Sequence, residues 1–198
     1  MTRHERLRAE LERYETSDPS EERHRAAMVA LLAAPDAFSR AHFAPGHFTA
    51  SCYVIDGRGR LLLHHHRRLD RWLQMGGHVE EDESPERTAL REGAEESGLR
   101  DLTLLGEGIF DLDIHGIPAA RRLDGLTEPD HDHYDVRYLA RTATPDAIAI
   151  DRAESNDLAW VTLDQAAELM PGSESRRVLR KIERLLSGSA ATSERSLF

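Results

Sequence analysis

The segment 84–98 constrains the structure of this chain more than any other part of the sequence. Ser84 can cap the first turn of a helix, and Pro85 suits the first helical position, where its missing N–H is not needed. Gly98 favours the left-handed conformation that commonly ends a helix. Together these signals predict a helix over residues 85–97.

Three glutamates share one face of this expected helix. At 100° per residue, Glu92, Glu95 and Glu96 lie within about 100° of one another. Like charges at such spacings destabilise an isolated helix by a few tenths of a kcal/mol per pair, so a compensating cation is expected. Mg²⁺ takes oxygen ligands and bridges carboxylates to substrate phosphate. The alternative is a solvated acidic face, in which Arg91 pairs with Glu95 one turn later.

The segment resembles the Nudix box, whose pattern is Gly-x5-Glu-x7-Arg-Glu-U-x-Glu-Glu-x-Gly-U, with U a bulky aliphatic residue. The seven fixed positions are all matched, by Gly77, Glu83, Arg91, Glu92, Glu95, Glu96 and Gly98. One position departs from the pattern, since Gly93 stands where the family has an aliphatic residue. We interpret this glycine as a sign of close packing between helix and sheet; loss of function is the other interpretation.

The resemblance implies a fold and a metal site. The implied fold is α/β, a Nudix-type α/β/α sandwich with a mixed β-sheet, to which this chain adds an N-terminal helical extension. The implied ligands of Mg²⁺ or Mn²⁺ are the carboxylates of Glu92, Glu95 and Glu96 and the carbonyl of Gly77. Arg91 would orient the acidic residues by pairing with Glu83 in a supporting role.

The resemblance also implies a reaction, the metal-dependent hydrolysis of a diphosphate linkage in a small nucleoside-diphosphate-type metabolite. Such a pyrophosphatase needs a carboxylate that deprotonates the attacking water. We expect this general base to be Glu92 or Glu95, with Arg91 among the catalytic residues. Glu154 is a further candidate, whose ordinary interpretation is an exposed loop residue.

Two functions of other classes stay open. A Nudix-like ligand-sensing or interaction domain without turnover would be expected to lack one or more box carboxylates, and none is lacking. A Nudix-fold isomerase of isoprenyl diphosphates would need a nucleophilic cysteine. Cys52 is the only cysteine of the chain, and a cysteine on a strand is more commonly a small buried apolar residue.

Histidine and charged side chains repeat at every second position of three expected strands, so each set shares one face of its strand. The candidate substrate-binding residues are on two of these strands: His64 and His66 on one, and His131, His133, Asp135 and Arg137 on another. The third strand carries Asp111, Asp113 and His115. If these strands line the groove beside the box helix, they would contact phosphate or hold an additional metal ion. The alternative is a polar sheet face that meets water.

Three regions are expected along the chain. Residues 1–40 form the N-terminal helical extension, with two helices that serve packing or homodimer formation, or else a lid over a site. Residues 41–187 form the Nudix hydrolase domain. Residues 188–198 are rich in Ser and Ala and are expected to be a disordered tail.

Composition narrows the partners. The net charge of −10 argues against a sequence-independent binder of duplex DNA, so nucleic acid is not expected. We expect neither a membrane-spanning helix nor a secretory signal, because no stretch approaches about 18 consecutive apolar residues. A single cysteine excludes an internal disulfide and favours a cytoplasmic setting. The expected partner is a small diphosphate-containing molecule.

Overall fold

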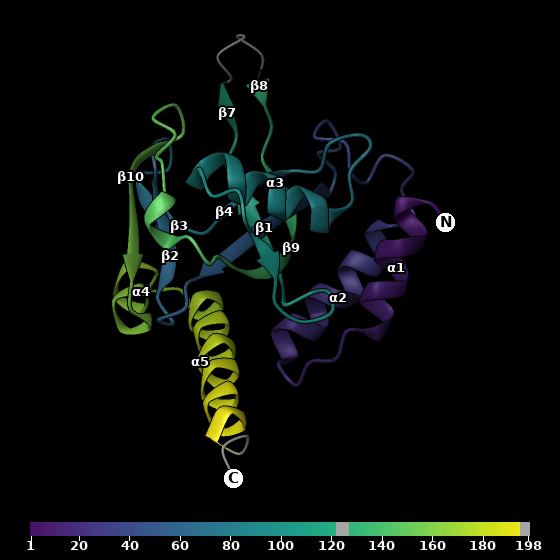
Figure 1. Cartoon of the computed structure of the whole chain (residues 1–198). Helices are drawn as coiled ribbons and strands as arrows, with labels where there is room; N and C mark the ends of the chain where they lie inside the picture. Colours follow the sequence, from purple (N-terminus) through teal and green to yellow (C-terminus); the bar gives the residue numbers. More distant parts are fainter. Residues whose placement is uncertain (122–126, 195–198) are drawn as a thin grey trace.

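A mixed β-sheet with helices on both faces forms the centre of the protein (Figure 1). The computed structural model describes residues 1–121 and 127–194. The helices are α1 (Arg3–Arg13), α2 (Pro19–Leu31), α3 (Pro85–Ser97), η1 (Pro145–Ala147, a 3-10 turn), α4 (Leu163–Leu169) and α5 (Ser173–Glu194). The strands are β1 (Gly46–Ile55), β2 (Leu61–His66), β3 (Arg71–Leu73), β4 (Met75–His78), β5 (Thr103–Leu104), β6 (Asp111–Ile117), β7 (Ala120–Arg121), β8 (Thr127–Glu128), β9 (His131–Arg141) and β10 (Ser155–Val161).

Within the described residues the main sheet has eight strands, ordered β10-β2-β1-β9-β5, with β3 on β2, β4 on β1 and β6 on β9. β1 and β9 run parallel in unbroken register from the Gly46–Asp132 pair to the Ile55–Arg141 pair, and the other pairings are antiparallel. The sheet is therefore mixed, as the resemblance to the Nudix family implies. β7 and β8 form a separate two-stranded hairpin.

The two faces of β1 pack in two different cores, because successive side chains of a strand point to opposite sides. Ala50 and Cys52 belong to the core under α3, α1 and α2, whereas Tyr53 and Ile55 belong to the core under α4 and α5. This alternation fixes which polar side chains of the sheet can reach the glutamates of α3.

The N-terminal helices are part of the first core. Leu7 and Leu11 of α1 and Met28 of α2 are buried among the sheet residues of that core. The apolar surface that favoured packing or a homodimer is thus used inside the chain. The homodimer stays a prediction without that support.

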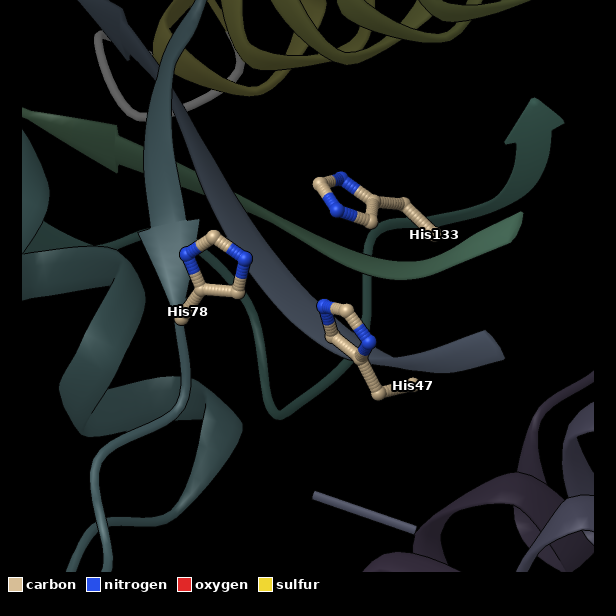
Figure 2. Close-up of side chains that lie close together, drawn as sticks. All are labelled: His47, His78 and His133. Atoms are coloured by element: carbon tan, nitrogen blue, oxygen red, sulfur yellow. The ribbon is translucent and has the colours of Figure 1, made fainter. Parts of the chain in front are cut away.

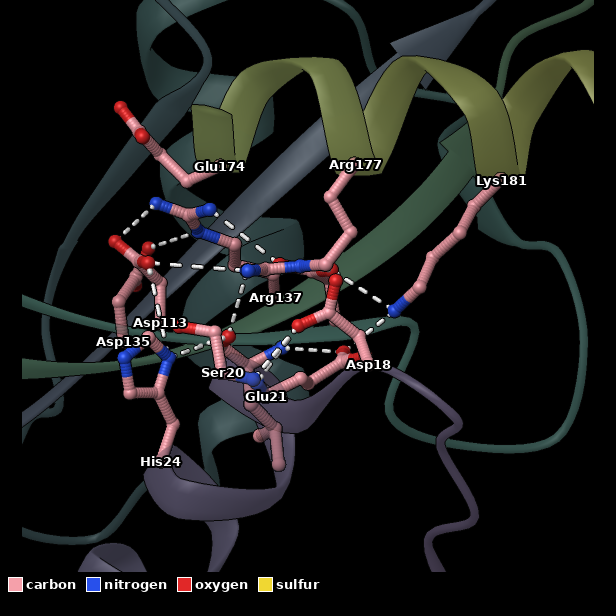
Figure 3. A network of polar contacts seen from close by, with 12 residues as sticks. Asp18, Ser20, Glu21, His24, Asp113, Asp135, Arg137, Glu174, Arg177 and Lys181 are labelled. Atoms are coloured by element: carbon pink, nitrogen blue, oxygen red, sulfur yellow. Dashed lines mark hydrogen bonds and ion pairs between the residues drawn. The ribbon is translucent and has the colours of Figure 1, made fainter. Parts of the chain in front are cut away.

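A network of buried charges fastens α2 and α5 to the sheet (Figure 3). Asp111 of β6 accepts hydrogen bonds from Arg177 Nε at 2.9 Å and from Lys181 Nζ at 2.8 Å. Lys181 also pairs with the fully buried Glu21 of α2, and Arg137 of β9 lies 3.4 Å from the Asp111 carboxylate. The first and last helical parts of the chain are therefore linked through one strand of the sheet.

The helix signals of the sequence are confirmed. Ser84 caps α3, Pro85 begins it, and Gly98 ends it with φ of 76°. At the start of α4, Thr162 and Gln165 form a capping box. The predicted tail, residues 188–198, is helical in α5 as far as Glu194, and its last four residues lie outside the described part. No helix among the described residues has the length and apolarity needed to cross a bilayer.

Candidate metal and catalytic centre

The box helix α3 directs two of its three box glutamates, Glu92 and Glu96, at strand β4. Glu96 is 3% exposed and its Oε2 accepts a hydrogen bond from the Gly76 N–H at 3.1 Å. Glu92 Oε1 lies where a side chain on Gly77 would be, since a Cβ built there would come within 2.3 Å of it. Only glycine at position 77 allows this close approach. Glu95 differs from both, because 59% of its side chain is exposed.

Arg91 holds the acidic residues in place. Its Nε donates to Glu83 at 3.0 Å, and its Nη1 donates to Glu92 Oε1 at 2.9 Å and to Glu95 Oε2 at 3.0 Å. Its Nη2 reaches the carbonyl of His78 at 3.3 Å. The pairing of Arg91 with Glu83 that the resemblance implies is therefore present, and one guanidinium connects the loop before α3, the helix and the end of β4.

Two carboxyl groups of this site lie in surroundings that disfavour their charged forms. Burial raises the pKa of Glu96 to about 9, helped by the charge of Glu92 and by a hydrogen bond with Glu154. Burial also raises the pKa of Glu92, although Arg91 opposes the shift. Buried carboxyls whose charged forms are this unfavourable are suited to a divalent cation, which restores the charged form through oxygen ligation. The residues present thus fit Mg²⁺ or Mn²⁺.

Strand β2 and the loop before β10 contribute further side chains to the site. His64 of β2 is buried, its Nε2 lies 4.0 Å from Glu96 Oε2, and its Nδ1 lies 2.8 Å from Ser155 Oγ. His66 packs edge-on against His64, with ring centroids 5.5 Å apart. Glu154 reaches Glu96 from the loop before β10. The structure therefore places His64, His66 and Glu154 beside the box carboxylates.

The candidates on β9 lie elsewhere. Asp135 accepts hydrogen bonds from Thr49 and Ser51, which point away from the face that holds Ala50 and α3. Arg137 is 4% exposed and donates to Asp135 at 2.9 Å and to Asp113 at 2.8 Å. The structure does not bring these side chains to the box glutamates, and it uses Asp135 and Arg137 in the buried charge network. His131 and His133 lie on that same face of β9.

Gly93 and Cys52 face each other across the contact between α3 and β1. A Cβ on Gly93 would lie 3.0 Å from Leu102 Cδ1 and 3.4 Å from Cys52 Cβ. This supports close packing as the reason for the departure from the box pattern. Cys52 itself is fully buried, and burial raises the pKa of its thiol to about 12. A thiol that is neutral and enclosed in the core does not serve the nucleophilic role that an isomerase would need.

Sequence reasoning missed Ser155, because a serine at the start of a strand has no distinguishing pattern. It also considered all the histidine and aspartate positions together, as side chains that could line one groove beside the box helix. No signal in the sequence separates them, because the register of β9 on β1, which places Asp135 opposite Thr49 and Val136 opposite Ala50, decides which face each side chain occupies.

Comparisons with known proteins agree with this geometry. Residues 45–182 match the family model of the NUDIX domain. A curated relative, the mutator protein MutT4 of Mycobacterium tuberculosis, is 28% identical over 132 residues, which cover 67% of this chain. The chain spans 45% of that relative's length.

Solved structures show the same architecture. A Nudix-family hydrolase from Clostridium perfringens is 26% identical with a TM-score of 0.52, covering 70% of this chain and 97% of its own. The Ap4A hydrolase of C. elegans, in a binary complex, is 20% identical with a TM-score of 0.53, covering 71% of this chain and 98% of its own. With the box residues, the fold and the family model in agreement, the chain belongs to the Nudix hydrolase family.

Proposed function

We propose that the protein is a pyrophosphohydrolase that uses Mg²⁺ or Mn²⁺ to cleave the phosphoanhydride bond of a small nucleoside-diphosphate-type metabolite. The observation that carries this proposal is the gathering of the half-buried Glu92 and the buried Glu96 around the glycines of β4. Residues 41–187 would form the catalytic domain, with residues 1–40 packed into it.

The residues that would hold the metal are Glu92, Glu95 and Glu96, together with the carbonyl oxygen of Gly77. A bound ion would neutralise charge on the phosphate oxygens and acidify a water molecule. Arg91 keeps Glu92 and Glu95 in one orientation through its two short hydrogen bonds, so these carboxylates need not reorganise when the substrate arrives.

Glu92 and Glu95 are the proposed candidates for the general base. They differ in surroundings, because Glu92 faces β4 and Glu95 faces solvent, where an attacking water has access. Replacing the general base lowers kcat while metal affinity is kept, whereas replacing a metal ligand weakens metal binding first. Measuring both quantities in Glu92→Gln and Glu95→Gln therefore assigns the two roles.

The proposed substrate class is based on the family and on the chemistry of the side chains that lie beside the box carboxylates. His64 and His66 offer imidazole nitrogens next to the carboxylates, and Glu154 borders the same space. Substrates to be tested include those of the related proteins, dinucleoside polyphosphates such as Ap4A, together with nucleoside triphosphates and sugar nucleotides. Imidazole donors beside a metal suit the phosphate part of all three classes.

The experiment is a measurement of phosphate or nucleoside-monophosphate release from this panel, with Mg²⁺, with Mn²⁺ and with chelator. Turnover of one class that requires the metal supports the proposal and names the substrate. A matched control is Glu86→Gln, which removes an exposed carboxylate from the same helix and is expected to leave turnover unchanged. Tight binding of a panel member without turnover would instead support the ligand-sensing alternative.

A further inference from the structure

Three histidine rings from three adjacent strands surround one point on the sheet face opposite α3. Figure 2 shows His47 of β1, His78 of β4 and His133 of β9 with their rings turned toward a common space. The ring centroids are 5.1 Å apart for His47 and His78, 5.0 Å for His47 and His133, and 5.3 Å for His78 and His133. The three rings thus form a nearly equilateral triangle.

The strand registers produce this triangle. His47 is the direct partner of His133 on the parallel strand β9, and His78 pairs with Thr49, two residues along β1. Residues 47 and 49 point to the same side of β1, away from Ala50 and Gly77. The histidine triangle and the box carboxylates therefore lie on opposite faces of the sheet.

His47 presents a lone pair to this space. Its side chain is fully buried, and its Nδ1 lies 3.2 Å from the backbone carbonyl of His42, which can only accept a hydrogen bond. The proton is therefore on Nδ1 and Nε2 is an acceptor. Within the described residues Nε2 of His47 has no hydrogen-bond partner. A backbone carbonyl that fixes the tautomer of a buried histidine is the usual outer contact of a metal ligand.

Burial disfavours the charged form of two of these rings. Burial lowers the pKa of His47 to about 4, and burial with the adjacent imidazoles lowers the pKa of His133 to about 2. The ring of His131 packs beside this triangle, stacked on the ring of His47 with a centroid distance of 4.9 Å. A neutral imidazole at His47 and at His133 keeps one ring nitrogen unprotonated at pH 7, so each of these two rings has a lone pair that can bind a metal ion.

We propose that His47, His78 and His133 bind a first-row transition metal ion of the Zn²⁺ class, with water in the fourth position. One nitrogen of each ring lies within 4.8 Å of the other two. Zn–N bonds of about 2.0–2.1 Å in tetrahedral geometry require nitrogens about 3.3 Å apart, so modest rotation of the side chains completes the site. Three imidazoles select Zn²⁺, Co²⁺ or Ni²⁺ over Mg²⁺, which prefers oxygen ligands.

Such an ion would join β1, β4 and β9 at the end of the sheet where Gly77 directly precedes His78. Its binding energy would add to the stability of the folded state and would raise the thermal midpoint. This site is independent of the proposed hydrolysis, because its ligands and the box carboxylates share no residue.

The test is a titration of tag-free, chelator-treated protein with Zn²⁺ and with Co²⁺ in millimolar Mg²⁺, which saturates the oxygen-ligand site. We expect one tightly bound equivalent, a visible Co²⁺ spectrum typical of tetrahedral nitrogen ligation, and a rise in Tm with Zn²⁺. His78→Gln and His133→Gln, at half-buried positions that tolerate the change, should lose the equivalent, the spectrum and the rise in Tm.

Two controls make the outcome specific. His65→Gln removes a half-buried histidine of β2 outside the triangle and should bind as the wild type does. Glu96→Gln should also retain the Zn²⁺ equivalent, which separates this site from the proposed active site. The proposal is overturned if the wild type binds no tight equivalent, or if His78→Gln and His133→Gln keep it.

Discussion

Replacing Asp111 by asparagine should strongly destabilise the protein, because this residue is the centre of the buried charge network. Its side chain is fully buried and accepts from Arg177 Nε at 2.9 Å, Arg177 Nη2 at 2.8 Å and Lys181 Nζ at 2.8 Å. Arg137 lies 3.4 Å away. Asparagine keeps one acceptor oxygen and turns an NH₂ group toward cations that are themselves donors.

The size of the effect follows from what is left unpaired. Removing one partner of a buried ion pair costs about 3–5 kcal/mol, since the remaining charge stays desolvated. For a domain of this length each kcal/mol lowers Tm by roughly 2–4 °C, so Asp111→Asn should lower Tm by roughly 6–20 °C. Thermal unfolding followed by circular dichroism, with urea unfolding for the free energy, measures both quantities.

The matched control is an exposed pair. Glu22 binds Arg25 with a shortest distance of 2.6 Å, but its side chain is 51% exposed. Glu22→Gln should therefore change the free energy of unfolding by less than about 1 kcal/mol. If Asp111→Asn were as stable as Glu22→Gln, the account of α2 and α5 as helices fastened by buried charge would be refuted.

Three further predictions concern the site and its packing. Gly77→Ala should lower kcat by about 100-fold with little change in Tm, because the new Cβ displaces the Glu92 carboxylate. Gly57→Ala, at a position with open space around it, should leave kcat unchanged. Equal kcat values in the two variants would disprove the close approach of Glu92 to Gly77. Gly93→Leu should lower the free energy of unfolding, measured in urea, by about 1–3 kcal/mol. Overpacking against Leu102 should outweigh the gain of about 1 kcal/mol that comes from replacing a glycine inside a helix. A variant more stable than the wild type would contradict this. Burial raises the pKa of Asp113, but His115 and Arg137 outweigh it and lower that pKa from 3.8 to about 2. The carboxylate therefore adds about 2 kcal/mol above pH 4 that is lost as the pH falls toward 2. Because the pKa values of Asp111 and Glu83 are also lowered, both proteins should lose stability in acid, and urea titrations from pH 5 to pH 2 should show a loss about 2 kcal/mol larger in the wild type than in Asp113→Asn; equal losses would contradict this.

Local signals in the sequence determine the helices well. Ser84, Pro85 and Gly98 act through contacts within a few residues, so α3 follows from chemistry that the sequence contains directly. The pairing of Arg91 with Glu83 is different, because Glu83 lies in the loop before the helix and helix periodicity does not fix its position. That pairing was implied by the resemblance to the Nudix box and not by the spacing of the two residues.

Register and burial are what the sequence does not supply. A period of two places His133, Asp135 and Arg137 on one face of a strand, but only the pairing of β9 with β1 decides that this face points away from α3. The integration of α1 and α2 into the core also depends on contacts distant in sequence, such as the pairing of Glu21 with Lys181. The same long-range register brings His47 and His78 together, which residue types alone did not reveal.

The measurement that tests the central claim most directly is the Mg²⁺ dependence of diphosphate hydrolysis in the wild type, Glu92→Gln, Glu96→Gln and Glu86→Gln, on the substrate that the panel identifies. We expect Glu92→Gln and Glu96→Gln to fold with unchanged far-UV spectra and to lose metal-dependent turnover, while Glu86→Gln keeps it. Near-native turnover in Glu92→Gln and Glu96→Gln would contradict the claim that these carboxylates bind the catalytic metal.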